Sequence, residues 1–263
     1  MELQELGGTG TMVPEIGLGT WRYRGGVAPL QHGIELGAAL IDTAEIYGSE
    51  DVVGEAIRGQ GEKVFLATKV SGEHLRYDQV LKAADASLKR LGLETIDLYQ
   101  VHWPDRRVPI SETMRALEVL VEAGKVRYIG VSNFSRPEFE AAQGALKKNR
   151  IVANQVEYGL HRRDVEPDLA PFYNRNQITI VAYSPFDQGQ LLSPRARGFA
   201  ALEAVAAETG KTPAQVALNW CLCHPGVIVI PKSDRVARVE ENCGASGWRL
   251  TADQVAGLDR AFS

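Results

Sequence analysis

Residues 64–102 read VFLATKVSGEHLRYDQVLKAADASLKRLGLETIDLYQVH, and this stretch shows the pattern on which the rest of the chain is built. Its two ends, 64–69 and 97–102, are short apolar runs of strand length. Between them, apolar side chains recur at helical spacing and predict one buried helix face, formed by Val80, Leu81, Ala84, Leu88 and Leu91. A strand, a helix and a second strand in this order predict two parallel strands with a helix packed over them.

The same unit recurs on both sides of this stretch. Strands are predicted at 17–21, 40–42, 64–69, 97–102, 127–132, 153–157, 179–183 and 227–230. Capping boxes mark three helix starts, at Ser135-x-x-Glu138, Thr212-x-x-Gln215 and Thr251-x-x-Gln254. Eight alternating units predict an α/β fold in which the strands close into a (β/α)8 TIM barrel.

An open, doubly wound sheet is the competing topology, and it normally carries a G-x-G-x-x-G loop after its first strand. Residues 17–22, GLGTWR, lack the third glycine and lead into no immediate helix, so the barrel is favoured. Ahead of them, residues 3–6 and 11–16 flank the turn GGTG at 7–10. This pattern predicts a β-hairpin, which we expect to cover the bottom of the barrel.

Size and charge limit the classes of function. The 263 residues are 44% hydrophobic and 24% charged, which fits one barrel domain over 1–263. A net charge of −4 argues against a nucleic-acid partner, and the apolar runs are too short to span a membrane. The N-terminus does not resemble a signal peptide, and three cysteines favour a reducing compartment. We therefore expect a cytoplasmic monomer, with no metal site at Cys221 or Cys223.

Four ionisable side chains fall at or just beyond predicted strand ends, where barrels place their active sites. They are Asp42, Tyr47, Lys69 and His102. A phenol with a free pKa of ~10 is a weak acid, and a neighbouring Lys69 ammonium is expected to lower the pKa of Tyr47. Asp42 would orient Lys69, and His102 could hydrogen-bond a substrate oxygen. Each residue alone has a structural explanation, but together they predict a site that protonates an oxygen while hydride reaches the adjacent carbon.

Several segments, taken in order, resemble the aldo-keto reductase family over essentially the whole chain. They are DTAEIYG at 42–48, TK at 68–69, VHWP at 101–104, GVSNF at 130–134 and IPKS at 230–233. The resemblance is to short microbial members that act as NADPH-dependent aldehyde and diketone reductases. It implies an NADP-dependent oxidoreductase with Tyr47 as general acid, tuned by Lys69 and Asp42, and with His102 orienting the carbonyl.

The resemblance also implies a binding site for NADPH or NADP+. Its residues would be Gly19, Thr20, Trp21, Asp42, Ser132, Asn133, Gln155, Tyr183, Ser184, Pro185, Lys232, Ser233, Arg238, Glu241 and Asn242. Within this set, Tyr183 would stack on the nicotinamide, and Lys232, Ser233 and Arg238 would hold the 2′-phosphate. Two cations and a hydroxyl ahead of a helix also suit a phosphate on chemical grounds.

The substrate-binding residues are expected to be Trp21, Tyr47, His102, Trp103 and Phe186. Two departures from the family bear on this pocket. Val70 and Ser71 stand where many members have Leu-Trp, and the chain stops at Ser263 without the long C-terminal segment of many eukaryotic members. The pocket is therefore expected to be open, and its partners to be diverse small carbonyl compounds.

Two other functions remain open from the sequence. A cofactor-binding regulatory subunit, like the potassium-channel β-subunits that resemble this family, would carry the same four residues. A barrel aldolase or isomerase could use Lys69 as a Schiff-base amine. Stable complex formation with a membrane partner would support the first, and borohydride trapping on Lys69 without nicotinamide would support the second.

Overall fold

A computed structural model describes residues 1–263, apart from the side chain of Glu62. Its main sheet holds eight parallel strands in the order β10-β9-β8-β7-β6-β5-β4-β3. They are β3 (Leu18–Gly19), β4 (Leu40–Asp42), β5 (Phe65–Val70), β6 (Ile96–Val101), β7 (Val126–Ser132), β8 (Ile151–Glu157), β9 (Thr179–Tyr183) and β10 (Val227–Val229).

The first and last of these strands close the sheet into a barrel. Parallel bridges join Ile16 to Val229 and Gly19 to Lys232, and the amide of Gly17 donates to the carbonyl of Val229 over 2.8 Å. The predicted (β/α)8 barrel is thereby confirmed. β3 is shorter than predicted because Thr20 and Trp21 have already left the sheet for the loop that follows it.

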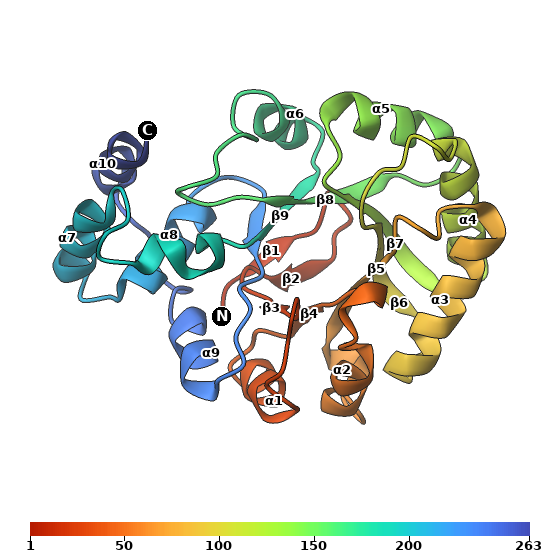
Figure 1. Ribbon diagram of the computed structural model, residues 1–263, viewed down its shortest axis with the longest axis horizontal. Coiled ribbons are helices and arrows are strands. Elements are labelled where there is room, and N and C mark those ends of the chain that lie inside the picture. The colour runs from red at the N-terminus through yellow and green to blue at the C-terminus, as the bar shows by residue number, and fades with distance from the viewer.

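Helices surround the strands in Figure 1. The described part of the chain forms ten α-helices. They are α1 (Ala28–Glu35), α2 (Glu50–Ala56), α3 (Tyr77–Leu91), α4 (Ile110–Glu122), α5 (Arg136–Ala145), α6 (Leu169–Arg175), α7 (Phe199–Thr209), α8 (Pro213–Leu222), α9 (Val236–Cys243) and α10 (Ala252–Phe262). Three 3₁₀ turns, η1 (Glu45–Tyr47), η2 (Gly61–Lys63) and η3 (Asp187–Leu192), lie in the connections. Among the described residues, no helix is both long and apolar enough to cross a bilayer.

Helix starts and helix faces largely follow the sequence pattern. Capping boxes are present before α5, α8 and α10, at the three predicted places. α3 buries Val80, Ala84, Leu88 and Leu91 as expected, but Leu81 is only partly buried. Each fully buried aliphatic side chain contributes about 1.5–3 kcal/mol relative to exposure, so this face fixes α3 against the barrel.

The predicted N-terminal hairpin is also confirmed, with β1 (Leu3–Glu5) antiparallel to β2 (Met12–Pro14). Leu6 and Val13 are fully buried in one cluster with residues from inside the barrel, including Phe65 and Val152. At Gly7, where φ is +54°, an added Cβ would lie 2.3 Å from the carbonyl oxygen of Val152. The turn therefore needs glycine to seal the bottom of the barrel, which leaves the opposite end for a site.

Candidate active site

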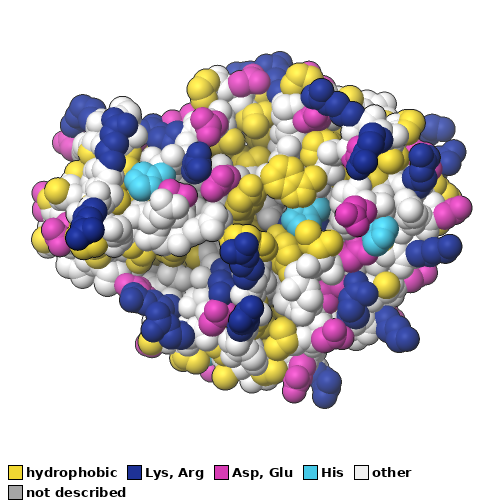
Figure 2. Space-filling model, viewed as in Figure 1, with side chains coloured by type: hydrophobic (Ala, Val, Ile, Leu, Met, Phe, Trp, Pro, Cys, Tyr) yellow, Lys and Arg dark blue, Asp and Glu magenta, His cyan; other side chains and the backbone are white. Residues whose placement is uncertain are grey.

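A cavity of 630 Å³ opens where the barrel strands end. Its lining includes Gly19, Thr20, Trp21, Asp42, Tyr47, His102, Trp103, Ser132, Asn133, Gln155, Tyr183, Ser184, Pro185, Phe186 and Lys232. A second cavity of 280 Å³ shares Phe186 and Lys232 with the first and includes Ser233, Arg238, Glu241 and Asn242. Every site residue predicted from the sequence therefore lines one cavity or the other, except Lys69. Figure 2 shows hydrophobic side chains around the hollow at the centre of this face.

Lys69 is absent from the lining because it lies buried below the cavity floor, at 0% exposure. Its Nζ donates to Asp42 Oδ1 over 2.6 Å and to the carbonyl of Thr43 over 2.8 Å. The other carboxylate oxygen, Oδ2, accepts from Gln155 Nε2 at 2.7 Å and from Gln100 Nε2 at 3.3 Å. The buried ion pair is therefore held in one geometry by hydrogen bonds from two further strands.

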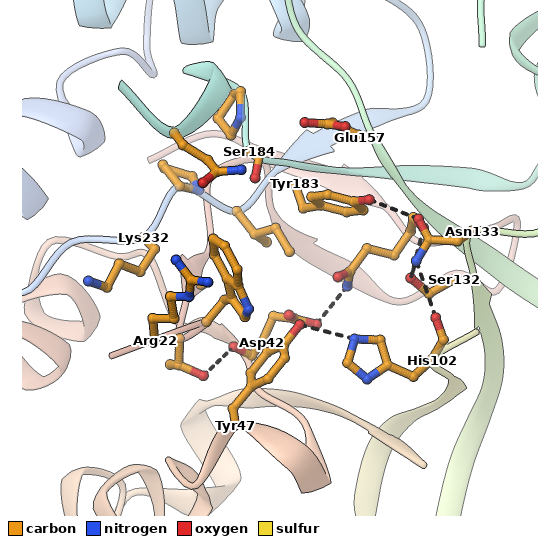
Figure 3. A pocket seen from close by; sticks show the side chains of 18 of the residues that line it. Arg22, Asp42, Tyr47, His102, Ser132, Asn133, Glu157, Tyr183, Ser184 and Lys232 are labelled. Carbon is orange, nitrogen blue, oxygen red and sulfur yellow. Dashed lines mark hydrogen bonds between the residues drawn. The ribbon is translucent and has the colours of Figure 1, made fainter. Parts of the chain in front are cut away.

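Tyr47 stands over this ion pair on the turn η1. Its hydroxyl lies 3.3 Å from His102 Nε2, and Figure 3 shows the two side chains pointing towards each other. Lys69 Nζ lies 4.9 Å from the centre of the Tyr47 ring. Burial, and then the charge of Asp42, raise the pKa of Tyr47 well above its ordinary value. The expectation of a lowered pKa for Tyr47 is therefore wrong in this structure, because burial and the charge of Asp42 outweigh any lowering by the Lys69 ammonium.

His102 is held in its neutral form. Burial, and then the nearby charge of Lys69, lower the pKa of His102 to about 3. Its Nδ1 is buried and has no hydrogen-bonding partner among the described residues, whereas Nε2 faces the hydroxyl of Tyr47. Because an N–H without a partner is costly to bury, the proton belongs on Nε2. His102 can then donate from Nε2 towards an oxygen atom in the cavity.

One wall of the cavity carries a network of hydrogen-bonding side chains. The hydroxyl of Tyr183 donates to Asn133 Oδ1 over 2.9 Å, and Asn133 Nδ2 donates to Ser132 Oγ over 3.0 Å. Ser132 Oγ donates in turn to the carbonyl of Gln155 over 3.0 Å. Asn133 adopts φ +61°, a left-handed conformation that asparagine tolerates better than most residues. These bonds fix a row of amides and hydroxyls beside the aromatic ring of Tyr183.

The outer cavity carries more charge than the inner one. Lys232 forms an ion pair with Asp234, and Arg238 forms one with Glu241. Lys232 and Arg238 were expected to be available to a phosphate, whereas the structure gives each a carboxylate partner. Asp234, the partner of Lys232, was not predicted, because closeness in sequence alone does not show whether two side chains point towards each other.

Other residues that line the cavities were not predicted from the sequence, among them Arg22, Ile46, Gln188, Gly189, Asp234 and Arg235. Arg22 stacks on Trp21 at 4.3 Å and extends into the cavity on the same side as Lys232 in Figure 3. Trp21, Ile46 and Trp103 are exposed apolar side chains at the mouth. The strand-end rule also applies to Glu157, at the end of β8, and could have identified Arg22, which directly follows the first predicted strand. Among the described residues, no group of three His, Cys, Asp or Glu side chains is placed to hold a metal.

Together, fold and site define a barrel protein with a buried Asp–Lys pair, a tyrosine and a neutral histidine at the inner end of an elongated, partly charged cavity. A family model described as "Aldo/keto reductase family" matches residues 15–262. The chain belongs to the aldo/keto reductase family, and it is an oxidoreductase.

Individual relatives agree with this assignment. Methylglyoxal reductase YeaE of Escherichia coli is 38% identical, over 95% of this chain and 91% of its own length. The solved structure of the thermostable aldo-keto reductase Tm1743, in complex with the inhibitor epalrestat, has a TM-score of 0.94 and 38% identity, and covers 99% of this chain and 100% of that one. An aldo/keto reductase of Klebsiella pneumoniae, in complex with NADP and acetate, has a TM-score of 0.91 and 36% identity, with 98% and 94% covered.

Proposed function

We propose that this protein reduces aldehydes and ketones to alcohols with NADPH, and that Tyr47 donates the proton. The observation that carries the proposal is the inner end of the cavity, where the Tyr47 hydroxyl and His102 Nε2 lie 3.3 Å apart above the buried Asp42–Lys69 pair. The Tyr47 hydroxyl and the His102 N–H can therefore both reach one oxygen atom in the cavity, and reduction of a carbonyl group requires that its oxygen be protonated.

The cavities fit a dinucleotide along their whole length. The row formed by Ser132, Asn133 and Gln155 suits the carboxamide of nicotinamide, and the Tyr183 ring offers a flat surface for stacking. At the other end, Lys232, Ser233 and Arg238 suit the 2′-phosphate. Gly19, Thr20, Trp21, Asp42, Ser184, Pro185, Glu241 and Asn242 complete the proposed contacts. The Klebsiella relative that was solved with NADP supports this choice of cofactor.

Bound NADPH would supply hydride to the carbonyl carbon. As negative charge develops on the carbonyl oxygen, the Tyr47 hydroxyl transfers its proton to that atom, and His102 donates a hydrogen bond from Nε2. A raised pKa keeps Tyr47 protonated and ready to donate. Transfer remains downhill because an alkoxide holds a proton about as tightly as hydroxide, whose conjugate acid has a pKa of ~15.7. Lys69, 4.9 Å from the ring, stabilises the phenolate that forms.

The substrates we propose are small aldehydes and dicarbonyls, bound against Trp21, Trp103 and Phe186. The rim is apolar and exposed, with Trp103 at 51% and Trp21 at 40%, so it offers surface rather than fixed polar contacts. The name of the Escherichia coli relative, a methylglyoxal reductase, supports this class.

The free thiols of Cys221, Cys223 and Cys243 support a reducing compartment, and we propose a cytoplasmic monomer.

Substitution of Tyr47 by phenylalanine tests the mechanism. Tyr47→Phe should lower kcat for aldehyde reduction by at least ~10²-fold, the typical effect of losing a positioned general acid. Its affinity for NADPH, measured by quenching of tryptophan fluorescence, should change little. Tyr128→Phe is the matched control, because it removes a phenol hydroxyl that bonds to Thr11 of the hairpin at the bottom of the barrel. Equal turnover by Tyr47→Phe and the wild type at saturating NADPH would refute the mechanism.

A further inference from the structure

Asp234 occupies an unexpected place for a carboxylate, at the end of the cavity proposed to receive a phosphate. It lies in the loop between β10 and α9 and lines the outer cavity. One carboxylate oxygen, Oδ2, accepts from Lys232 Nζ, and the other, Oδ1, accepts from the backbone amide of Arg24 over 2.8 Å. Asp234 thus joins the loop after β10 to the loop after β3.

The bond to Arg24 prevents the carboxylate from moving aside freely. The backbone of this second loop packs closely on Asp234, since a Cβ added at Gly25 would lie 2.9 Å from the Asp234 Cα. A rotation of Asp234 towards solvent would therefore break its hydrogen bonds to the Arg24 amide and to Lys232 together. Burial acts to raise the pKa of Asp234, but the bonds from Arg24 and Lys232 outweigh burial and hold the pKa below its ordinary value. The carboxylate stays ionised at neutral pH.

The charges around the outer cavity are consequently almost balanced. Three cationic side chains, Lys232, Arg235 and Arg238, line it together with two anionic ones, Asp234 and Glu241, which leaves a net charge of +1. A phosphate dianion would have to draw Lys232 away from Asp234 or sit beside a fixed negative charge. A ribose that carries a free 2′-hydroxyl meets no such penalty, because a hydroxyl can donate a hydrogen bond to a carboxylate.

We propose that Asp234 acts as a specificity-determining residue that narrows the preference for NADPH over NADH, so that the enzyme uses both nucleotides. This inference rests on the proposed function. The Asp234 carboxylate weakens binding of the 2′-phosphate because it is already paired with Lys232. The same carboxylate can accept a hydrogen bond from the 2′-hydroxyl of NADH. Cofactor preference is then set by the competition between Asp234 and the phosphate for one lysine.

Replacement of the carboxylate by its amide isolates the charge. Asp234→Asn keeps an oxygen that can accept from the Arg24 amide, so the two loops should stay joined. The dissociation constants of NADPH and NADH are measured by tryptophan fluorescence, in the absence of any carbonyl substrate. The Kd for NADPH should fall about fivefold, the effect of a partly exposed charge pair, while the Kd for NADH should change less than about twofold.

Glu240→Gln is the matched control, because it removes one negative charge from the exposed side of α9, the helix that follows Asp234, and should leave the ratio of the two constants unchanged. An unchanged ratio in Asp234→Asn, with both nucleotides bound, would overturn this inference alone. Equal shifts in Asp234→Asn and Glu240→Gln would also overturn it, since only overall charge would then matter. Binding of neither nucleotide by the wild type would overturn the proposed function and this inference with it.

Discussion

At the scale of single residues, Asp42 organises the inner end of the site. Its carboxylate receives hydrogen bonds from Lys69, Gln155 and Gln100, which come from three different strands. A buried carboxylate is stable only when its oxygens are paired in this way. The same charge opposes ionisation of Tyr47, while burial and Lys69 keep His102 neutral. Both candidate proton donors are thus held in their uncharged forms.

The pKa of His102 leads to a prediction about stability. In the folded chain this pKa is about 3, whereas its ordinary value is 6.5. Between pH 3 and pH 6.5 the unfolded chain binds a proton at His102 that the folded chain does not bind. The titration of this histidine therefore leaves the free energy of unfolding unaffected above pH 6.5 and decreases it as pH falls towards 3. When the pH is lowered from 7 to 5, the free energy of unfolding of the wild type should fall by about 2 kcal/mol more than that of His102→Gln.

Urea unfolding of both proteins at pH 7 and pH 5 measures this difference. Equal losses in the two proteins would contradict a neutral, buried His102. A larger loss in His102→Gln would mean that the imidazole gains a stabilising charge in the folded state, which is the opposite sign.

At the scale of elements, the turn η1 is fastened to the loop that follows β5. Glu45 Oε2 accepts from the amide of Ser71 at 2.8 Å, and Glu45 Oε1 lies 2.6 Å from His74 Nδ1. Tyr47 is two residues further along the same turn. Its position therefore depends on a side-chain bond between loops, because the turn is too short to hold a shape by itself.

Loss of the hydrogen bonds made by Glu45 should reduce the rate of catalysis without changing the affinity for NADPH. In Glu45→Ala, Tyr47 is expected to shift relative to His102, and kcat for aldehyde reduction should fall about tenfold, since small misplacements of reacting groups are costly. Glu45→Gln keeps an oxygen for the Ser71 amide and should retain most of the activity. Steady-state kinetics and NADPH titration separate the two effects. A fall in NADPH affinity that matches the fall in kcat would show that Glu45 supports the fold of the whole site instead.

At the scale of the whole molecule, closure of the barrel brings together loops from opposite ends of the chain. The bridge between Gly19 and Lys232 sets the loop that carries Trp21 and Arg22 beside the loop that carries Asp234. The rim of the inner cavity is left exposed at Trp21, Ile46 and Trp103. The inner cavity consequently opens to solvent at the hollow in the centre of the face shown in Figure 2.

An open apolar pocket predicts a broad substrate range. Each added methylene should change selectivity by only ~1–3 kcal/mol, because few polar groups are placed to reject an analogue. Small aliphatic and aromatic aldehydes and dicarbonyls should all be reduced, and simple ketones should be reduced more slowly. Bulky steroids should gain little in kcat/KM from their additional surface. Values of kcat/KM over such a panel, measured by NADPH consumption, test this expectation. A preference above about 10⁴-fold for one compound would require a closed, polar pocket.

The sequence by itself determined the barrel, the hairpin at its base and many, but not all, of the residues that line the site. Periodicity was sufficient for the strands and helices because each hydrophobic run has to be buried on one side. The strand-end rule placed Asp42 and His102 at the cavity, because parallel strands of one barrel all end on one face. The resemblance to a family added five residues around the outer cavity: Lys232, Ser233, Arg238, Glu241 and Asn242.

Only the tertiary structure decided how these residues are paired. The sequence predicted the pairing of Asp42 with Lys69, but it could not show that Gln155 and Gln100 also donate to Asp42, how far Tyr47 is buried, or that Lys232 is neutralised by Asp234. It therefore predicted the wrong direction for the pKa of Tyr47. The physical reason is that burial and pairwise electrostatics depend on distances between atoms from separate strands and loops, and these distances exist only once the barrel has closed.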